Sequence, residues 1–176
     1  MMKKTIYLFV FAIITISCDS LDSLLELNIN NDLTENIAVS VSQTQGVAAS
    51  FDLSETTDLN SGDLAEYRGK ISAIKINKFT YKIKDFVGNN AGTIPSGTLK
   101  FDDVVVAELT DFNIFQAADA GTVFEITDAN VLSSVENAFL NNNTTTVRLT
   151  GTVLSDAGTM DFNVEIFMNL NATIVD

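Results

Sequence analysis

The chain has 176 residues, of which 23 are acidic and ten are basic, so its formal net charge is −13. It contains no histidine, which excludes a Ser-His-Asp triad and removes the commonest metal ligand. An acidic chain repels a phosphate backbone, so we expect no nucleic-acid partner. The sequence also carries no phosphate-cradling glycine loop and no nucleophile motif, and we expect no catalytic residue, no cofactor and no metal site.

The N-terminal segment has the pattern of an export signal. Two lysines, Lys3 and Lys4, precede an uncharged run from Ile6 to Ile16. As a helix rising ~1.5 Å per residue, this run reaches only about half of a ~30 Å hydrocarbon core. Residues 1–17 are therefore predicted to be a signal peptide rather than a membrane span.

The only cysteine of the chain, Cys18, follows this run almost directly. Residues 15–18 read Thr-Ile-Ser-Cys and resemble the lipobox of bacterial lipoproteins, in which small residues precede an invariant cysteine. Thr15 departs from the usual Leu or Val at its position. The resemblance implies that Cys18 is diacylated, becomes the new N-terminus and tethers the protein to a membrane. Ordinary signal cleavage that leaves Cys18 as a free thiol is the alternative.

Residues 18–23 are predicted to form the lipidated cysteine and a short acidic tether. Asp19-Ser20-Leu21 and Asp22-Ser23-Leu24 resemble O-glycosylation sites of Bacteroidota secreted proteins, with an ordinary polar linker as the alternative. The resemblance implies a Bacteroidota-type lipoprotein of the cell envelope, with the outer membrane as the expected membrane. Acidic residues after the cysteine resemble both an inner-membrane retention signal and a surface-export signal, so the periplasmic and surface faces both stay open.

Without residues 1–17 the chain retains eight basic and 23 acidic residues, a net charge of −15. Residues 24–176 suit a single domain with a hydrophobic core. With Cys18 committed to lipid, no cysteine is left for a disulfide, so packing alone must stabilise this domain.

Alternation of apolar and polar residues predicts β-structure from Leu24 onward. The first expected strands are 25–29, 37–41 and 51–53, with a turn at 30–32. A long strand from Ile71 to Phe86 changes the parity of its apolar residues twice, which predicts bulges near 73–74 and 77–78. A strand that bends in this way is expected to pass from one sheet to the other.

The second half of the chain begins with a predicted loop over 88–97, followed by short strands at 99–101, 104–109, 112–115 and 123–126. Asp128 is expected to cap a helix that ends at 141–143. A hairpin with its turn at 155–158 is expected to close the chain. Its last strand, Phe162 to Ile174, alternates without interruption and is predicted to lie centrally in a sheet.

These elements predict an all-β fold, an Ig-like β-sandwich of about 8–10 strands with one short helix. A jelly roll or an open barrel is the alternative arrangement.

Most basic residues of the domain lie in or beside the long strand 71–86. Lys78, Lys82 and Lys84 have the parity opposite to its apolar residues and are predicted to line one solvent-facing strip. One interpretation is an anion-binding site for an acidic glycan or a lipid phosphate. The other is a solvated strand face paired with carboxylates, which the excess of acidic residues favours.

These features favour a membrane-anchored, non-enzymatic binding or scaffolding module of unknown ligand. The expected partners are the membrane, reached through Cys18, and a protein or an anionic glycan. A subunit of a surface assembly that donates its C-terminal strand is the alternative. A carboxylate-based hydrolase is a further alternative, since a sequence does not show whether two acids lie about 5–10 Å apart. It is less expected, because no residue pattern supports it positively.

Overall fold

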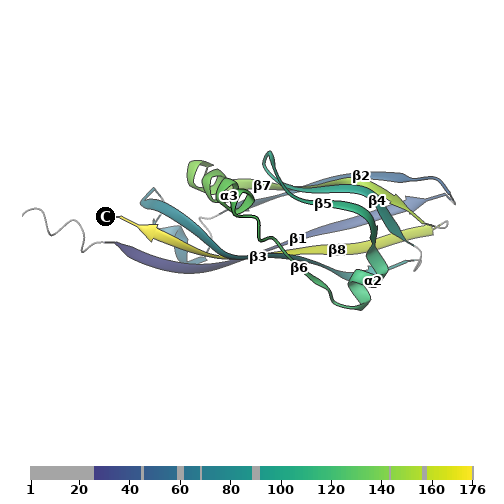
Figure 1. Cartoon of the computed structure of the whole chain (residues 1–176), viewed down its shortest axis with the longest axis horizontal. Coiled ribbons are helices and arrows are strands. Elements are labelled where there is room, and N and C mark those ends of the chain that lie inside the picture. The colour runs from purple at the N-terminus through teal and green to yellow at the C-terminus, as the bar shows by residue number, and fades with distance from the viewer. Residues whose placement is uncertain are drawn as a thin grey trace, which may run out of the picture.

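The computed structural model describes residues 26–44, 46–58, 62–67, 69–88, 92–142, 144–155 and 158–175. They form two antiparallel four-stranded sheets packed face to face (Figure 1). Sheet A has the order β1 (Leu27–Gln43), β8 (Gly158–Ile174), β3 (Ile71–Val87) and β6 (Val123–Glu125). Sheet B has the order β2 (Ala49–Asp58), β7 (Thr144–Leu154), β4 (Thr93–Phe101) and β5 (Val104–Asn113). The predicted all-β sandwich is confirmed.

The strand order is that of a jelly roll, which was the alternative expected from the sequence, rather than the Ig-like order expected first. The chain pairs as if it were folded double at the β4–β5 turn. The resulting strand pairs are β4·β5, β3·β6, β2·β7 and β1·β8. The doubled ribbon then wraps so that successive pairs alternate between the sheets. Consecutive strands β7 and β8 therefore lie in different sheets, and the predicted hairpin at 155–158 is wrong. The central position predicted for β8 is confirmed, since β1 and β3 flank it.

Strand β3 stays in sheet A along its whole length, so the predicted passage between sheets is wrong. The bulges are confirmed: the pairing of β3 with β8 shifts between Ile71 and Ala73 and between Ile76 and Lys78. A third shift lies between Lys84 and Val87. Each bulge re-aims the side chains without removing the strand from its sheet, because β8 continues beside it.

Strand β1 is continuous where a turn was expected at 30–32. It pairs with β8 from Leu27 opposite Ile174 to Gln43 opposite Gly158. Asn30 and Asp32 belong to its solvent-facing set and bond across to β8, which is why these turn-prone residues do not break the strand.

Two more boundaries differ from the sequence expectation. Strand β4 starts at Thr93 rather than after residue 97, and Pro95 lies where the pairing skips a residue, as its missing N–H requires. Residues 112–115 were expected to be a strand, but the short helix α2 (Ile114–Asp119) begins there. The carboxamide of Asn113 caps α2 by accepting a hydrogen bond from the Gln116 N–H at 2.8 Å.

The predicted helix is confirmed as α3 (Ala129–Asn142). The Asp128 carboxylate caps it, accepting hydrogen bonds from the backbone N–H groups of Asn130 (2.8 Å) and Val131 (3.3 Å). Its buried face, Val135 and Phe139, packs against β3, β5 and β7. None of the helices in the described ranges has the length and apolar character needed to span a bilayer.

Sheet A is much longer than sheet B. Strands β1, β3 and β8 each have 17 residues, which at ~3.3 Å per residue is about 56 Å. Figure 1 shows sheet A extending past sheet B at the end where the chain enters β1 and leaves β8. There α3 and the 3₁₀ helix η2 (Gly62–Tyr67), whose Leu64 is fully buried, cover inner-face side chains that sheet B does not reach.

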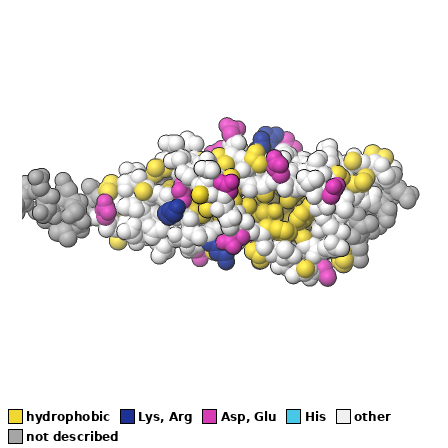
Figure 2. Space-filling view, in the orientation of Figure 1, with side chains coloured by type: hydrophobic (Ala, Val, Ile, Leu, Met, Phe, Trp, Pro, Cys, Tyr) yellow, Lys and Arg dark blue, Asp and Glu magenta, His cyan; other side chains and the backbone are white. Residues whose placement is uncertain are grey.

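The core lies between the sheets, where Phe79 of β3 meets Phe101 of β4 edge to face with ring centroids 5.1 Å apart. Figure 2 shows hydrophobic side chains gathered at the sandwich edge between α2 and α3. At that edge the ring centroids of Phe112 on β5 and Phe124 on β6 lie 5.4 Å apart, so this contact joins the two sheets.

We expect Gly151→Ala to destabilise the fold, because sheet B has no room for a methyl group there. A Cβ at Gly151 would lie 2.8 Å from Phe51 Cζ, 2.9 Å from the Ser96 carbonyl oxygen and 3.0 Å from Gly97 Cα. Backbone atoms cannot move aside, so the free energy of unfolding should fall by about 1–3 kcal/mol in urea titrations. Thr150→Ala, one residue away on the solvent side, is the control and should cost less than about 1 kcal/mol. Equal losses for the two variants would contradict this account.

Candidate functional site

The sequence predictions for the N-terminal segment lie outside the described residues. These are the signal peptide at 1–17, the lipidation site Cys18 and the tether at 18–23, whereas the description begins at Glu26. Lipidation and envelope location therefore stay predictions. The candidate sites in the folded domain are its two outer sheet faces.

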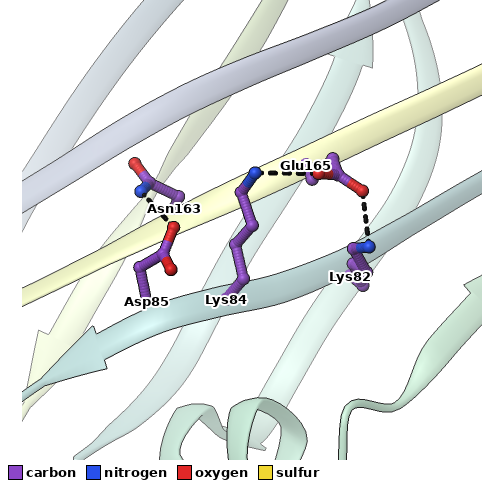
Figure 3. A network of polar contacts seen from close by, with 5 residues as sticks. All are labelled: Lys82, Lys84, Asp85, Asn163 and Glu165. Atoms are coloured by element: carbon purple, nitrogen blue, oxygen red, sulfur yellow. Dashed lines mark hydrogen bonds and ion pairs between the residues drawn. The ribbon is translucent and has the colours of Figure 1, made fainter.

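On sheet A, two lysines of the predicted strip share one carboxylate. Lys82 Nζ lies 2.6 Å from Glu165 Oε1, and Lys84 Nζ lies 2.8 Å from Glu165 Oε2 (Figure 3). The strand register causes this arrangement, because Glu165 lies opposite Lys82 on β3. Lys84 is two residues farther along β3, so its side chain points to the same face. Hydrogen bonds from both lysines hold the pKa of Glu165 below its usual value, and the bond to Glu165 raises the pKa of Lys84.

The third member of the strip, Lys78, is exposed and lies opposite Asn169 of β8. Among the described residues it has no ion-pair partner. The strip is thus one free cation and two cations that Glu165 partly neutralises. Whether Lys78, Lys82 and Lys84 bind an anion stays a prediction.

Another part of the outer face of sheet A, where β8 lies beside the first residues of β1, bonds to itself. Amide and hydroxyl side chains of β8 pair with those of β1 directly across the ladder, at 2.7–3.1 Å. The pairs are Asn28 with Thr173, Asn30 with Asn171, and Asp32 with Asn169. On the β3 side Asn163 donates to Asp85 at 2.9 Å (Figure 3). Polar groups that already bind one another have little capacity left for a ligand.

The outer face of sheet B differs, because it is hollowed. An open hollow of about 490 Å³ crosses all four strands of this sheet. Two cross-strand rows of polar side chains line it. One row runs Asp52, Thr150, Thr98, Glu108, and the other contributes Thr152, Ser96 and Thr110.

Most polar groups of this hollow have no side-chain partner. Among the described residues the hydroxyls of Thr98, Thr110 and Thr150 and the carboxylate of Glu108 make no side-chain hydrogen bond. A long contact between the Ser96 and Thr152 hydroxyls, at 3.3 Å, is the internal bond of the second row. The face therefore presents donors and acceptors that are open to a ligand.

At the β2 end of the hollow Asp52 is held by an arginine. Arg148 of β7 binds the carboxylate with both Nε and a terminal nitrogen, the Nε bond to Oδ1 measuring 2.7 Å. This hydrogen-bonded pairing lowers the pKa of Asp52 and raises that of Arg148. Asp52 stays ionised but is occupied, so the free carboxylate of the hollow is Glu108.

The two acids of the hollow lie at opposite ends of one row. Three strand-to-strand steps separate Asp52 from Glu108, about 14 Å along the sheet at ~4.8 Å per step. Paired glycosidase carboxylates lie about 5–10 Å apart. Asp52 and Glu108 are therefore farther apart than the paired acids of a glycosidase. In the described ranges no group of three or more Cys, Asp or Glu side chains is placed to hold a metal ion.

Sequence reasoning missed this hollow. Its serines and threonines alternate with core residues in three separate strands and look there like ordinary solvent-facing positions. The paired glycines, Gly97 on β4 and Gly151 on β7, were the available signal. They mark a place in the middle of a sheet where side chains are missing from the inner face.

No protein-family model, curated protein or solved structure matches this chain.

The Glu165 pair gives a pH-dependent expectation. Because its pKa is lowered in the folded state, Glu165 contributes stability above its unfolded pKa, and that contribution disappears as pH falls through the folded pKa. Glu165→Gln should lower the free energy of unfolding at neutral pH by about 1 kcal/mol or less. The deficit should shrink as pH falls below the ordinary glutamate range and should vanish once the carboxylate of the parent protein is protonated, which its lowered pKa moves to more acidic pH.

Urea titrations of both proteins across this pH range measure the difference. Glu108→Gln, which removes a carboxylate without an ion pair, is the control and should show no such pH-dependent deficit. A Glu165→Gln deficit that persists unchanged in acid would contradict the ion-pair account.

Proposed function

We propose that this protein is a lipid-anchored lipoprotein of the cell envelope that binds an uncharged glycan on the outer face of sheet B. The anchor is the lipid on Cys18, and the role is binding rather than catalysis. The observation that carries the binding site is the contrast between the two outer faces. On sheet A many polar side chains bond to one another, whereas in the sheet B hollow the hydroxyls of Thr98, Thr110 and Thr150 have no side-chain partner among the described residues.

The chemistry of the hollow favours a polyhydroxylated, neutral ligand. Sugar hydroxyls donate and accept hydrogen bonds, as threonine hydroxyls do, so rows of threonines can satisfy them along a chain. Among the described residues no lysine or arginine lines the hollow, Arg148 beside it is bound to Asp52, and Glu108 adds a negative charge. These features disfavour an acidic glycan here. The hollow offers no exposed aromatic ring for stacking, so we expect weak, hydrogen-bond-dominated binding.

The open shape of the hollow supports a chain-like ligand over a small molecule enclosed on all sides. It crosses the sheet from β2 to β5, and its volume of about 490 Å³ is within the range of ligand sites. The separation of Asp52 and Glu108 supports binding without hydrolysis.

Strand donation to a surface assembly has less support. The proposed donor, β8, pairs with β1 on one side and with β3 on the other, over nearly all of its length. Its inner face supplies eight of the buried core residues, from Met160 to Ile174. Removing this strand would open the core of the whole domain, so we do not favour donation.

The glycan proposal is tested with a Thr98→Val, Thr150→Val double variant. Valine preserves shape and strand propensity but removes both hydroxyls, so binding should weaken about tenfold or more if each contributes ~1 kcal/mol. Affinity electrophoresis through gels containing neutral glucans, mannans or xylans, with acidic alginate alongside, measures retardation of the parent and variant proteins.

Thr34→Val is the matched control, since Thr34 is an exposed threonine on the outer face of sheet A. We expect it to bind like the parent. The proposal would be contradicted if no glycan retarded the parent protein, or if alginate alone did. It would also be contradicted if the double variant and the parent were retarded equally.

The anchor is tested independently with Cys18→Ser. Loss of the thiol removes the acylation site, so the variant should lose metabolic labelling by a palmitate analogue and leave the membrane fraction. Protease treatment of intact cells then shows which face of the membrane the anchored parent protein occupies. A variant that stays membrane-bound and labelled would contradict lipidation at Cys18 without affecting the glycan test.

A further inference from the structure

A second, smaller hollow lies between the end of β3 and helix α2. Its volume is about 170 Å³, and it is lined by Asp85, Phe86, Phe115, Ala118 and Asp119. It shares no residue with the sheet B hollow and belongs to the other sheet. Its chemistry is also different, because two phenyl rings and two carboxylates make up most of the lining.

The two rings form an angled wall. The ring centroids of Phe86 and Phe115 lie 5.9 Å apart with the ring planes inclined at 60°. Both side chains are only half-buried, although each could pack fully if the site were simply core. A ring face carries partial negative charge and attracts a cation within about 6 Å of its centroid. Two inclined faces can contact one cation from two sides.

Two acidic residues, Asp85 and Asp119, line the same hollow. Asp85 has a positive φ of 55°, a costly conformation outside glycine, at the bulge where the β3 pairing shifts. Its Oδ2 accepts a hydrogen bond from Asn163, which steadies the side chain (Figure 3). Asp119 ends α2 and is exposed, with no side-chain partner among the described residues.

Among the described residues neither acid forms an ion pair, although the positive charge of Lys84 interacts with Asp85. Lys84 precedes Asp85 in the chain, but its ammonium group is bound to Glu165. The hollow thus combines two negative charges with two ring faces, and both favour a cation. A small inorganic ion keeps its water shell and gains little from phenyl rings, whereas an organic ammonium group has alkyl surface to bury against them.

We propose that this hollow binds an organic ammonium group, with Phe86 and Phe115 contacting its alkyl carbons and Asp85 and Asp119 balancing its charge. Aromatic cages that bind quaternary ammonium groups use the same combination. The volume of about 170 Å³ fits a headgroup rather than a whole drug-sized molecule. The site is independent of glycan binding on sheet B, so either can fail without the other.

Choline chloride is the probe, and 3,3-dimethylbutan-1-ol, its uncharged carbon analogue, tests the need for charge. Titrations of the isotope-labelled folded domain, followed by NMR, should shift signals of α2 and of the end of β3 with a Kd in the millimolar range. The neutral analogue should cause no comparable shift, and added salt should weaken choline binding. A primary amine, n-butylamine, distinguishes a lysine-like ammonium from a quaternary one by its relative affinity.

Two variants locate the site. Phe115→Leu keeps apolar volume but removes a ring face, and should weaken choline binding about fivefold. Asp119→Asn removes an exposed charge without risk to the core. It should weaken choline binding and make the choline affinity less sensitive to salt. Asp103→Asn, an equal charge change in the β4–β5 turn, is the control and should bind like the parent.

Equal shifts from choline and its neutral analogue would overturn the proposal. So would the absence of any choline-dependent shift in α2, or choline affinity left unchanged in both Phe115→Leu and Asp119→Asn.

Discussion

The alternation of strand β8 is the constraint on which the rest of the structure depends. Every second residue from Met160 to Ile174 is buried, and the residues between them face solvent. Because β8 pairs with β1 and β3 along almost its whole length, its register determines which side chains of three strands enter the core. A slip of one residue would bring Glu165 and the asparagines of β8 into the apolar interior. The ion pairs of Lys82 and Lys84 and the asparagine pairs across to β1 exist because that register is kept.

The two outer faces of the sandwich differ in how many of their polar side chains stay available to a ligand. On sheet A the long, fully paired strands bring complementary polar groups into direct opposition, so amides meet amides and lysines meet Glu165. On sheet B, Gly97 and Gly151 lie side by side on neighbouring strands, and a Cβ on either would crowd atoms within the sheet. The hollow over this region is bordered in one row by the neighbouring Thr98 and Thr150, and in the next row by Thr110 and Thr152 on either side of Ser96. Arg148 forms an ion pair with Asp52 at one end of the hollow, and the side chains in its middle are uncharged.

Local patterns predicted local features well and long-range pairing poorly. The uninterrupted alternation of β8, the parity changes of β3 and the capping aspartate of α3 are all encoded within a few neighbouring residues, and each prediction was confirmed. The turn at 30–32 was wrong because the partners of Asn30 and Asp32 lie about 140 residues away on β8. The closing hairpin was wrong because a short connection serves equally to join strands in one sheet or in two. The sheet B hollow assembles serines and threonines from β4, β5 and β7, so no single stretch of sequence could reveal it.

The central claim is that the unpaired hydroxyls of sheet B, and not the lysine strip of sheet A, form the ligand-binding face. Threonine methyl groups report on this directly, since they sit on the same side chains as the hydroxyls. We would record methyl NMR spectra of the folded domain during titration with a neutral oligosaccharide that retards the protein. The account predicts shifts for Thr98, Thr110 and Thr150, whose hydroxyls have no side-chain partner among the described residues. Shifts confined to Thr34 and to residues beside Lys78 and Lys82, with the sheet B threonines unmoved, would contradict it.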